Sequence, residues 1–216
     1  KDNTPAEIDN FTTLVFTFLV LLKSNNLTVK ELKSMAKETT DERALLFLDL
    51  FSPIFTSYNE YLKESGEIDF SDMINLATKE IKSHNFISPY KYIIIDEFQD
   101  ISLSRYQLIK SLIDNRPETK LFCVGDDWQS IYRFTGSDIG IFTGFEEYFK
   151  ATPIAGFERK TSKSYIENTY RFDNQLIELS SNFILRNPNQ IRKALKSKIQ
   201  SDKKPFTILS YDYNNS

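Results

Sequence analysis

The stretch that decides the fold is YIIIDEFQDISLSRYQLIKSL, Tyr92–Leu112. It begins as a run of β-branched residues, passes through two acids, a glutamine and a third acid, and continues as an amphipathic helical pattern. A second apolar run, LFCVGD (121–126), follows and ends in glycine and acid. Strand, helix and strand at this spacing predict a parallel βαβ unit whose strands are buried on both faces.

Composition sets limits on the class of protein. The chain has 216 residues, of which 40% are hydrophobic and 26% charged, so it can bury a substantial core. The net charge of −3 is too slight to indicate a partner class, and any nucleic-acid contact must therefore be local. A single cysteine, Cys123, and a single histidine, His84, exclude a disulfide, a Cys/His zinc site and a Ser-His-Asp triad within the chain. We expect Cys123 to be a buried small hydrophobe and His84 to be a solvated or capping residue.

The first third of the sequence repeats helix-start chemistry. TPAE from Thr4, TVKE from Thr28 and TDER from Thr40 each place a capping threonine or acid ahead of an apolar-periodic run. A fourth helix is predicted by DFSDMINLATKEIKS, in which Asp69 is the cap. Residues 1 to about 85 are therefore expected to be all helical.

The apolar segment LVFTFLVLL (14–22) is the most membrane-like part of the sequence. It has about half of the ~20 residues needed to span a bilayer, so we expect a core helix. The sequence before it lacks the basic flank of a signal peptide, and no small-residue cleavage site follows. With the low cysteine count, this pattern favours a cytoplasmic protein without a membrane partner.

A change in composition follows Pro153. The stretch ATPIAGFERKTS (151–162) leads into SYIENTYRF (164–172), which predicts a short strand, and then into a helix over 174–185. FTILSYDY (206–213) predicts another strand. We interpret the change as a linker between two α/β lobes.

Acidic residues stand where both predicted strands end. Ligands of an open parallel sheet bind off the carboxyl ends of its strands, where Asp96, Glu97 and Asp126 fall. One carboxylate at a strand tip can hold Mg²⁺ beside substrate phosphates, and an adjacent carboxylate can take a proton from an attacking water. An Asp-Glu pair on its own has a simpler explanation, because acidic residues commonly end a strand where the chain enters solvent.

The pair does not stand alone. The second strand runs into VGDDWQSIYRFTGSD (124–138), and NTYRF (168–172) follows. Two further motifs are EIDFSDMINLA (67–77) and DEFQDIS (96–102). Together, the motifs resemble those of the superfamily 1 helicases of the UvrD/Rep type, and their residues are most similar to those of the DNA helicase IV branch. A chance match to all of them in this order is very improbable.

The resemblance implies an α/β fold, namely a fragment of the RecA-like parallel sheet of a P-loop NTPase. Residues 1–85 would be part of an all-helical insertion in the first motor lobe, and 86–153 the second half of that lobe. Residues 154–216 would be the start of a second RecA-like α/β lobe.

The resemblance also implies roles for individual residues. Asp96 would coordinate the Mg²⁺ of Mg-ATP, and Glu97 would activate the hydrolytic water. Gln99 and Asp100 would tie this strand end to neighbouring motifs. Gln129 would hydrogen-bond the γ-phosphate of ATP and so sense whether the nucleotide is intact.

Three further residues are expected at the nucleotide. In NTYRF, Arg171 would reach the γ-phosphate from the second lobe, as an arginine finger supplied in cis. Tyr170 would stack on the adenine. Asp126 is expected beside the nucleotide because it ends the second strand.

The segment QSIYRF suggests how hydrolysis is coupled to DNA. Tyr132 and Phe134 are two residues apart, so in an extended segment they would point to the same side and could stack on unpaired bases. Gln129 precedes them on the same loop, so loss of the γ-phosphate would move the aromatic pair. The alternative is that Tyr132, Phe134 and Trp128 belong to the core. Many family members have tryptophan where Phe134 stands and arginine where Thr135 stands.

The phosphate-binding motif GxxxxGK[ST] does not occur in the sequence. The family has it upstream of the DEFQD strand, so we interpret the chain as an internal fragment. We expect the fragment alone not to hydrolyse ATP, because Asp96 and Glu97 have no partner lysine.

The leading hypothesis is a fragment of an ATP-dependent DNA helicase of replication or repair. The family implies 3′ to 5′ movement on single-stranded DNA and action at single-strand/duplex junctions. One alternative is a helicase-like ATPase that remodels a protein partner such as RNA polymerase, and another is the motor part of a helicase-nuclease. The pair Tyr132 and Phe134 favours the DNA-tracking hypothesis, because a remodeller has little need for it.

Overall fold

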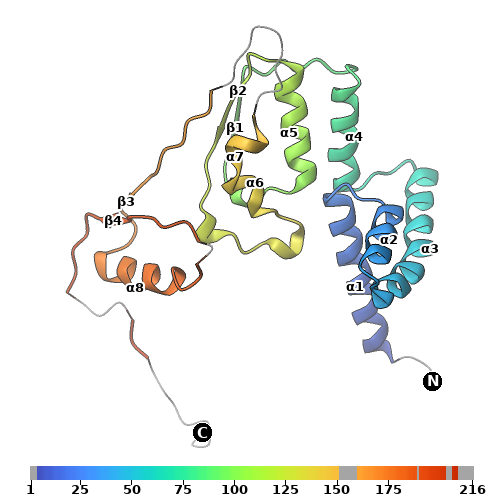
Figure 1. Cartoon of the computed structure of the whole chain (residues 1–216), viewed down its shortest axis with the longest axis horizontal. Coiled ribbons are helices and arrows are strands. Elements are labelled where there is room, and N and C mark those ends of the chain that lie inside the picture. The colour runs from blue at the N-terminus through green and yellow to red at the C-terminus, as the bar shows by residue number, and fades with distance from the viewer. Residues whose placement is uncertain (1–3, 151–159, 189, 203–205, 209–216) are drawn as a thin grey trace, which may run out of the picture. The chain divides into compact units, whose positions relative to one another are not determined.

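The computed structural model describes residues 4–150, 160–188, 190–202 and 206–208 (Figure 1). The chain divides into two compact units, residues 1–159 and 160–216. Each unit is described by itself below.

The first unit begins with four helices, as the capping signals predict. They are α1 (Pro5–Ser24), α2 (Val29–Glu38), α3 (Glu42–Ser65) and α4 (Phe70–Lys82). Capping boxes begin α1, α2 and α4, whereas Asp41 caps α3. The caps satisfy backbone N–H groups that have no partner inside the helix, which is why these residues fix where each helix starts.

The long helix α1 packs on α3 through apolar side chains. Val15, Leu19 and Leu22 form a buried cluster with Phe51 of α3. By length and composition alone, α1 could also cross a membrane. That is weak evidence, since core helices of soluble proteins pass the same test.

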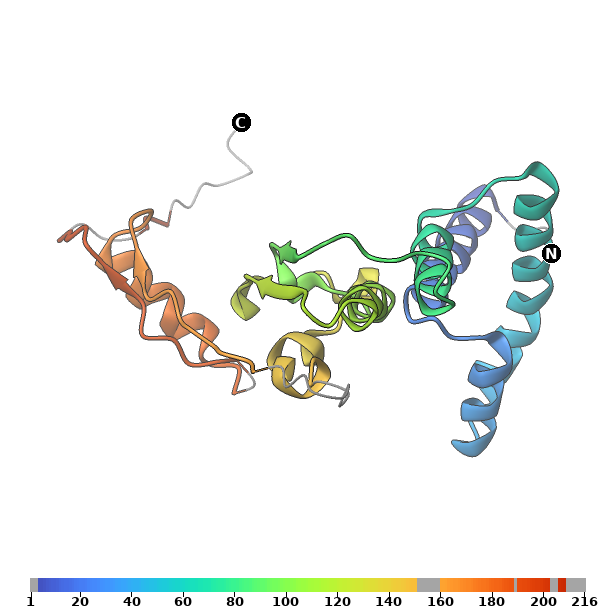
Figure 2. The same ribbon diagram turned by 90° about the horizontal axis from the view of Figure 1, so that it is seen from above.

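The βαβ unit predicted around DEFQD is present. Strand β1 (Tyr92–Ile95) pairs in parallel with β2 (Lys120–Cys123), and helix α5 (Leu103–Asn115) connects them. Both figures place α5 beside the strands, with α4 packed on the far side of α5 (Figure 1, Figure 2). Two short helices follow, α6 (Ile139–Thr143) and α7 (Phe145–Tyr148). They complete a core whose most buried members are Phe98, Ile101, Ile113, Ile141 and Phe149.

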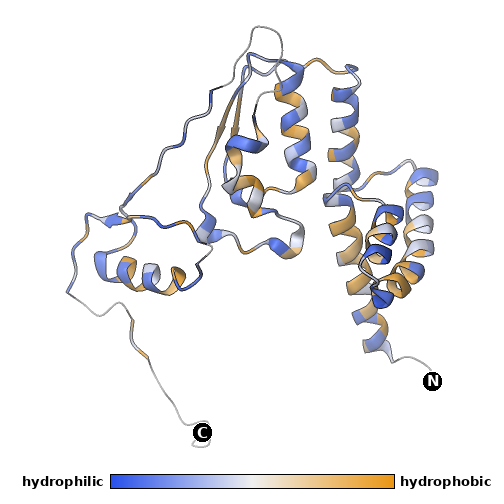
Figure 3. Ribbon diagram, viewed as in Figure 1, coloured by the Kyte–Doolittle hydropathy of each residue, from blue (hydrophilic) through white to orange (hydrophobic). Residues whose placement is uncertain are grey.

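The prediction that the strands are buried on both faces is wrong for the described residues. Ile93, Ile95 and the residues paired with them pack against the core. The alternate side chains are exposed, 74% for Ile94 and 61% for Phe122. The last three residues of each strand, 93–95 and 121–123, are apolar on both sides (Figure 3), which is the pattern of a two-sided sheet. The described helices α5, α6 and α7 cover one side only. We call this uncovered side the bare face.

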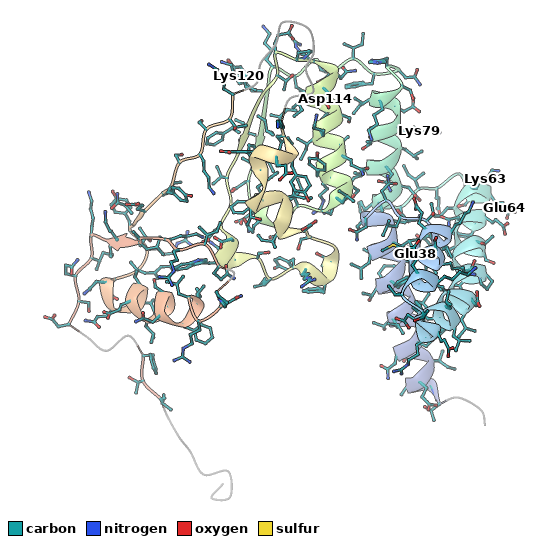
Figure 4. All side chains as sticks on the ribbon, viewed as in Figure 1. Glu38, Lys63, Glu64, Lys79, Asp114 and Lys120 are labelled. Carbon is teal, nitrogen blue, oxygen red and sulfur yellow. The ribbon has the colours of Figure 1, made fainter. Side chains whose placement is uncertain are left out.

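The short connection from α5 to β2 is fixed to the segment before β1. Asp114 lies near the end of α5 and Lys120 begins β2 (Figure 4). Between them, the Thr119 hydroxyl donates to the Tyr90 carbonyl at 2.7 Å, and Lys120 N donates to the Lys91 carbonyl at 2.9 Å. These bonds set the register that brings the two strand ends level at the opposite end of the sheet.

The second unit holds less regular structure than the sequence predicts. The expected strand in SYIENTYRF is reduced to β3 (Asn168–Thr169), which pairs in parallel with β4 (Lys196–Ser197). The predicted helix is confirmed as α8 (Asn174–Ile184), capped by Asp173. Of the strand predicted over 206–213, residues 206–208 are not in a strand and the rest lie outside the described residues, as does most of the expected linker at 151–162.

Candidate functional site

The chain turns sharply where β1 ends. Strand pairing stops at Ile95, and Glu97 has left-handed backbone angles, φ 51° and ψ 42°, before a 3₁₀ turn, η1 (Phe98–Asp100). The left-handed region costs a residue with a side chain about 1 kcal/mol or more, so the surrounding contacts must hold it. The Asp96 carboxylate accepts a hydrogen bond from Glu97 N at 2.9 Å. Both acids are exposed at the carboxyl end of the sheet.

Gln99 joins the ends of the two strands. Its side chain is 1% exposed, and its Oε1 accepts a hydrogen bond from Asp126 N at 2.9 Å. Its Nε2 donates to the Glu97 carboxylate at 2.7 Å and approaches Asp100 Oδ2 at 3.5 Å. An amide is suited to this place because it offers an acceptor and two donors on one planar group. We call this arrangement the Gln99 joint.

Gly125 makes room for the Gln99 joint. A Cβ at this position would lie 2.7 Å from Gln99 Oε1, 2.8 Å from the Phe142 ring and 3.0 Å from Gln99 N. No side chain fits at these distances. The glycine of the motif GDDWQ is therefore explained by close packing against the joint.

Asp126 organises the loop that follows β2. Its carboxylate caps the 3₁₀ turn η2 (Asp127–Gln129), accepting hydrogen bonds from Trp128 N at 3.1 Å and from Gln129 Nε2 at 2.9 Å. Gln129 is exposed, while its amide is oriented by Asp126. The acid expected to contact a nucleotide thus positions the glutamine expected to sense it.

Tyr132 and Phe134 lie on an irregular loop. The prediction of an extended segment is wrong, because Arg133–Thr135 form a 3₁₀ turn, η3, that ends in Gly136 with φ 92°. The two rings nevertheless lie together, with centroids 6.0 Å apart and planes inclined by 50°. Tyr132 is 46% and Phe134 66% exposed, which contradicts the alternative that these two belong to the core. We call residues 130–136 the aromatic loop.

Tyr170 and Arg171 belong to the second unit and are described there alone. Both are exposed, and the Lys198 ammonium lies 5.5 Å from the Tyr170 ring centroid. Arg171 N donates to the Thr169 hydroxyl at 3.3 Å, directly after β3. Their side chains thus follow a strand end, as those of Asp96 and Glu97 do.

The donor set suits a loosely held magnesium ion. The described residues contain no group of three or more Cys, His, Asp or Glu side chains that could enclose a metal. Mg²⁺ in nucleotide sites is held by one or two carboxylates, with phosphates and waters as the other ligands. The exposed Asp96 carboxylate at the strand tip fits that requirement.

Cys123 and His84 take no part in this site. Cys123 is half-buried against the core and not fully buried as the sequence predicts. Its burial raises the pKa of the thiol to about 12, so the thiol is protonated at neutral pH. His84 has φ 58° and follows the end of α4, where its backbone N–H donates to the Ile81 carbonyl at 3.1 Å. This is a C-terminal capping position.

One buried charged cluster was not foreseen from the sequence. Lys23, at the end of α1, is 6% exposed, and its ammonium lies 2.6 Å from the Asp69 carboxylate and 2.8 Å from that of Asp72, at the start of α4. The Tyr58 hydroxyl donates to Asp69 at 3.2 Å. The signal available was a lysine ending an otherwise apolar helix, with two acids in a predicted cap. We call these four residues the Lys23 cluster.

The charge states of the Lys23 cluster follow from its geometry. Burial opposes both charges, but the hydrogen bonds and charges of Asp69 and Asp72 outweigh it and hold the pKa of Lys23 above its ordinary value. In the same way, Lys23 and the backbone N–H of Asp72 outweigh burial and hold the pKa of Asp69 below its ordinary value. Lys23 and Asp69 are therefore ionised at neutral pH.

The family of the chain follows from comparison with known proteins. The UvrD/REP helicase N-terminal domain matches residues 1–150, so the chain belongs to the UvrD/Rep helicase family. This span includes the Gln99 joint and the aromatic loop.

Individual relatives agree with that assignment. The chain is 38% identical over 162 residues to DNA helicase IV of Escherichia coli, covering 75% of this chain and 22% of that protein. It is 27% identical over 209 residues to a probable DNA helicase II homolog of Mycoplasma pneumoniae, covering 92% of this chain and 28% of that protein. For the ATP-dependent DNA helicase Rep of Escherichia coli the identity is 26% over 155 residues, covering 69% and 21%. The chain thus spans between a fifth and three tenths of the length of these relatives.

Proposed function

We propose that the full-length protein is a cytoplasmic ATP-dependent DNA helicase that couples Mg-ATP hydrolysis to 3′ to 5′ movement on single-stranded DNA. In this proposal it acts at single-strand/duplex junctions during replication or repair. The relatives are named as DNA helicases, which supports the class of activity.

A single observation carries the coupling. The Gln99 joint ties the strand end that bears Asp96 and Glu97 to the backbone of Asp126, and the same segment leads through Gln129 to the exposed aromatic loop. A change at the nucleotide is therefore linked, through these hydrogen bonds and the short segment from Asp126 to the loop, to a surface that can stack on bases. Base stacking on aromatic rings is independent of sequence, as a translocating protein requires.

At the nucleotide, each residue of the first unit has a distinct task. Asp96 would hold the Mg²⁺ that neutralises phosphate charge, and Glu97 would accept a proton from the attacking water. Gln129, oriented by Asp126, would donate its amide to the γ-phosphate. Gln99 would keep the Glu97 carboxylate aimed, because its Nε2 already donates to that carboxylate at 2.7 Å.

The remaining tasks fall to neighbouring and second-unit residues. Asp100, beside the Gln99 amide, would support the joint. Arg171 would stabilise the charge that develops on the γ-phosphate, and Tyr170 would stack on the adenine. Both side chains are exposed and follow β3, which leaves them accessible to a nucleotide.

The test of the proposal is ATP hydrolysis by the full-length protein with and without single-stranded DNA. We expect DNA to stimulate hydrolysis, and Glu97→Gln to lower the stimulated rate by about 10²- to 10⁴-fold, the usual contribution of a general base. The matched control is Glu118→Gln, which removes an exposed acid paired with Arg116 just before β2, at the opposite end of the sheet from Glu97. Hydrolysis that is indifferent to DNA would favour the protein-remodelling alternative.

A second variant tests the aromatic loop. Phe134→Ala should weaken single-strand binding by about 1–3 kcal/mol, because it removes one stacking face. Phe16→Ala, on α1 and similarly exposed at 62%, serves as the control. Unchanged DNA affinity in Phe134→Ala would refute the assigned role.

A further inference from the structure

The downstream end of the aromatic loop rests on the end of helix α1. Gly136 is buried, and a Cβ there would lie 3.1 Å from Ser24 Cβ and 3.6 Å from Leu21 Cδ2. Its φ of 92° is one that residues with a side chain rarely adopt. Glycine is required here twice, for its backbone angles and for the close approach to α1.

Two further contacts fix this end of the loop. Ser137 forms an antiparallel bridge with Ser102, and Asp138 N donates to the Ile101 carbonyl at 2.8 Å. At its upstream end the loop follows Asp126, whose backbone is bound by Gln99. The exposed Tyr132 and Phe134 thus lie between two anchored ends.

The end of α1 is itself held in place. Lys23, next to Ser24, forms ion pairs with Asp69 and Asp72 of α4. Its carbonyl also accepts a hydrogen bond from Asn75 Nδ2 at 3.2 Å. A shift of the α1 end relative to α4 would separate buried charges, which is costly. Residues 21–24 therefore form a rigid surface under Gly136.

We infer that residues 21–24 of α1 are a positioning support for the aromatic loop, so that the helical segment sets where Tyr132 and Phe134 meet single-stranded DNA. This inference rests on the proposed function and deepens it. It assigns the Lys23 cluster and Gly136 a task in DNA binding although neither would touch DNA. Movement driven from the Gln129 end would then pivot on a fixed point at Gly136.

The test compares two glycine-to-alanine variants of the full-length protein. Gly136→Ala adds a methyl group against Ser24, whereas Gly66→Ala, at φ 69°, adds one where nothing lies within 4 Å. Both variants carry backbone strain, so both should lower thermal stability. Only Gly136→Ala should raise the oligodeoxythymidylate concentration for half-maximal ATPase stimulation, by about tenfold, which corresponds to 1.4 kcal/mol.

A double variant separates contact from strain. Ser24→Gly removes the atoms closest to the added methyl group, so Ser24→Gly/Gly136→Ala should recover much of the DNA response while the strain at residue 136 remains. Equal half-maximal concentrations in Gly136→Ala and Gly66→Ala would overturn the inference, and so would a double variant no better than Gly136→Ala. A wild-type protein whose hydrolysis ignores DNA would overturn the proposed function, and this inference with it.

Discussion

Two buried polar groups hold the first unit together, and they do so by different chemistry. At the strand ends, Gln99 is a neutral amide that bonds to the backbone of Asp126 and the carboxylate of Glu97. Between α1 and α4, Lys23 is a buried cation paired with two carboxylates. Both side chains are less than a tenth exposed, so the contrast lies in charge and not in burial.

The contrast teaches which contact is suited to change during a reaction cycle. The Gln99 amide contributes about 1 kcal/mol through its bond to the Asp126 N–H and about 1.5–3 kcal/mol through its bond to the Glu97 carboxylate, and a neutral amide that exchanges one partner for another leaves no charge unpaired. A buried ion pair that loses one partner leaves an uncompensated charge, which costs about 3–5 kcal/mol. We therefore expect the hydrogen bonds of the Gln99 joint to change during a reaction cycle, and the ion pairs of the Lys23 cluster between α1 and α4 to stay intact.

The largest effect is expected from breaking the Lys23 cluster. Lys23→Met should lower the free energy of unfolding of the chain by about 3 kcal/mol, because Asp69 and Asp72 remain half-buried without their cation. Urea unfolding followed by circular dichroism measures it. Lys33→Met breaks the exposed pair with Asp49 and should cost less than about 1 kcal/mol. Equal costs for the two variants would contradict the distinction drawn here.

A smaller loss is expected at the Gln99 joint. Gln99→Leu should cost about 2 kcal/mol, because the buried Asp126 N–H loses its acceptor while the apolar volume is kept. Gln107→Leu, which removes a hydrogen bond to Asn26 at the surface, is the control and should cost about 0.5 kcal/mol. A cost as large as that of Lys23→Met would show that the joint is not the weaker of the two.

The two groups should also differ in their response to pH. The pKa of Asp69 is lowered in the folded state, so its contribution is complete above its ordinary value of 3.8 and is lost as pH falls through the folded value. The pKa of Lys23 is raised, so its contribution is complete below 10.5 and is lost only above the folded value. Unfolding measured against pH should show the cost of Lys23→Met constant near neutrality and shrinking in acid. A cost that grows in acid would contradict this sign.

The smallest expected effect is a change in the alkylation rate of Cys123, which measures how often the covered face of the sheet becomes accessible to solvent. Cys123 lies on the covered face of β2, and its pKa of about 12 keeps the thiol protonated. Alkylation by a thiol reagent at pH 8 should be slow in the folded chain and fast in urea. If Gln99→Leu loosens this side, alkylation should quicken in that variant and not in Lys23→Met.

The sequence predicted the elements better than the contacts between them. Threonine and aspartate caps located α1, α2 and α4, and the apolar runs located β1 and β2, because these signals act within a few residues. The strand-end positions of Asp96, Glu97 and Asp126 followed from the same runs. The ion pair between Lys23 and Asp69 could not be predicted in this way, because the two residues are 46 positions apart in the sequence.

Two errors have clear physical causes. The aromatic segment was expected to be extended, but Gly136 permits a tight turn that folds η3 back on α1. The apolar run YIII predicts a sheet buried on both faces. Such a run does not indicate which segments of the protein would cover each face. Neither the turn nor the missing cover is visible in local patterns.

The bare face of the sheet has a consequence for how the chain behaves in solution. It presents Tyr92, Ile94 and Phe122 to water on neighbouring strands. Such a patch promotes self-association when net charge is small, and the chain has a pI near 5.4. We therefore expect solubility to be poorest in weakly acidic buffers and to fall further with sulfate, which strengthens apolar association. We therefore recommend handling the chain above pH 7.5 at moderate chloride concentration, because no described helix of the first unit covers this side of the sheet.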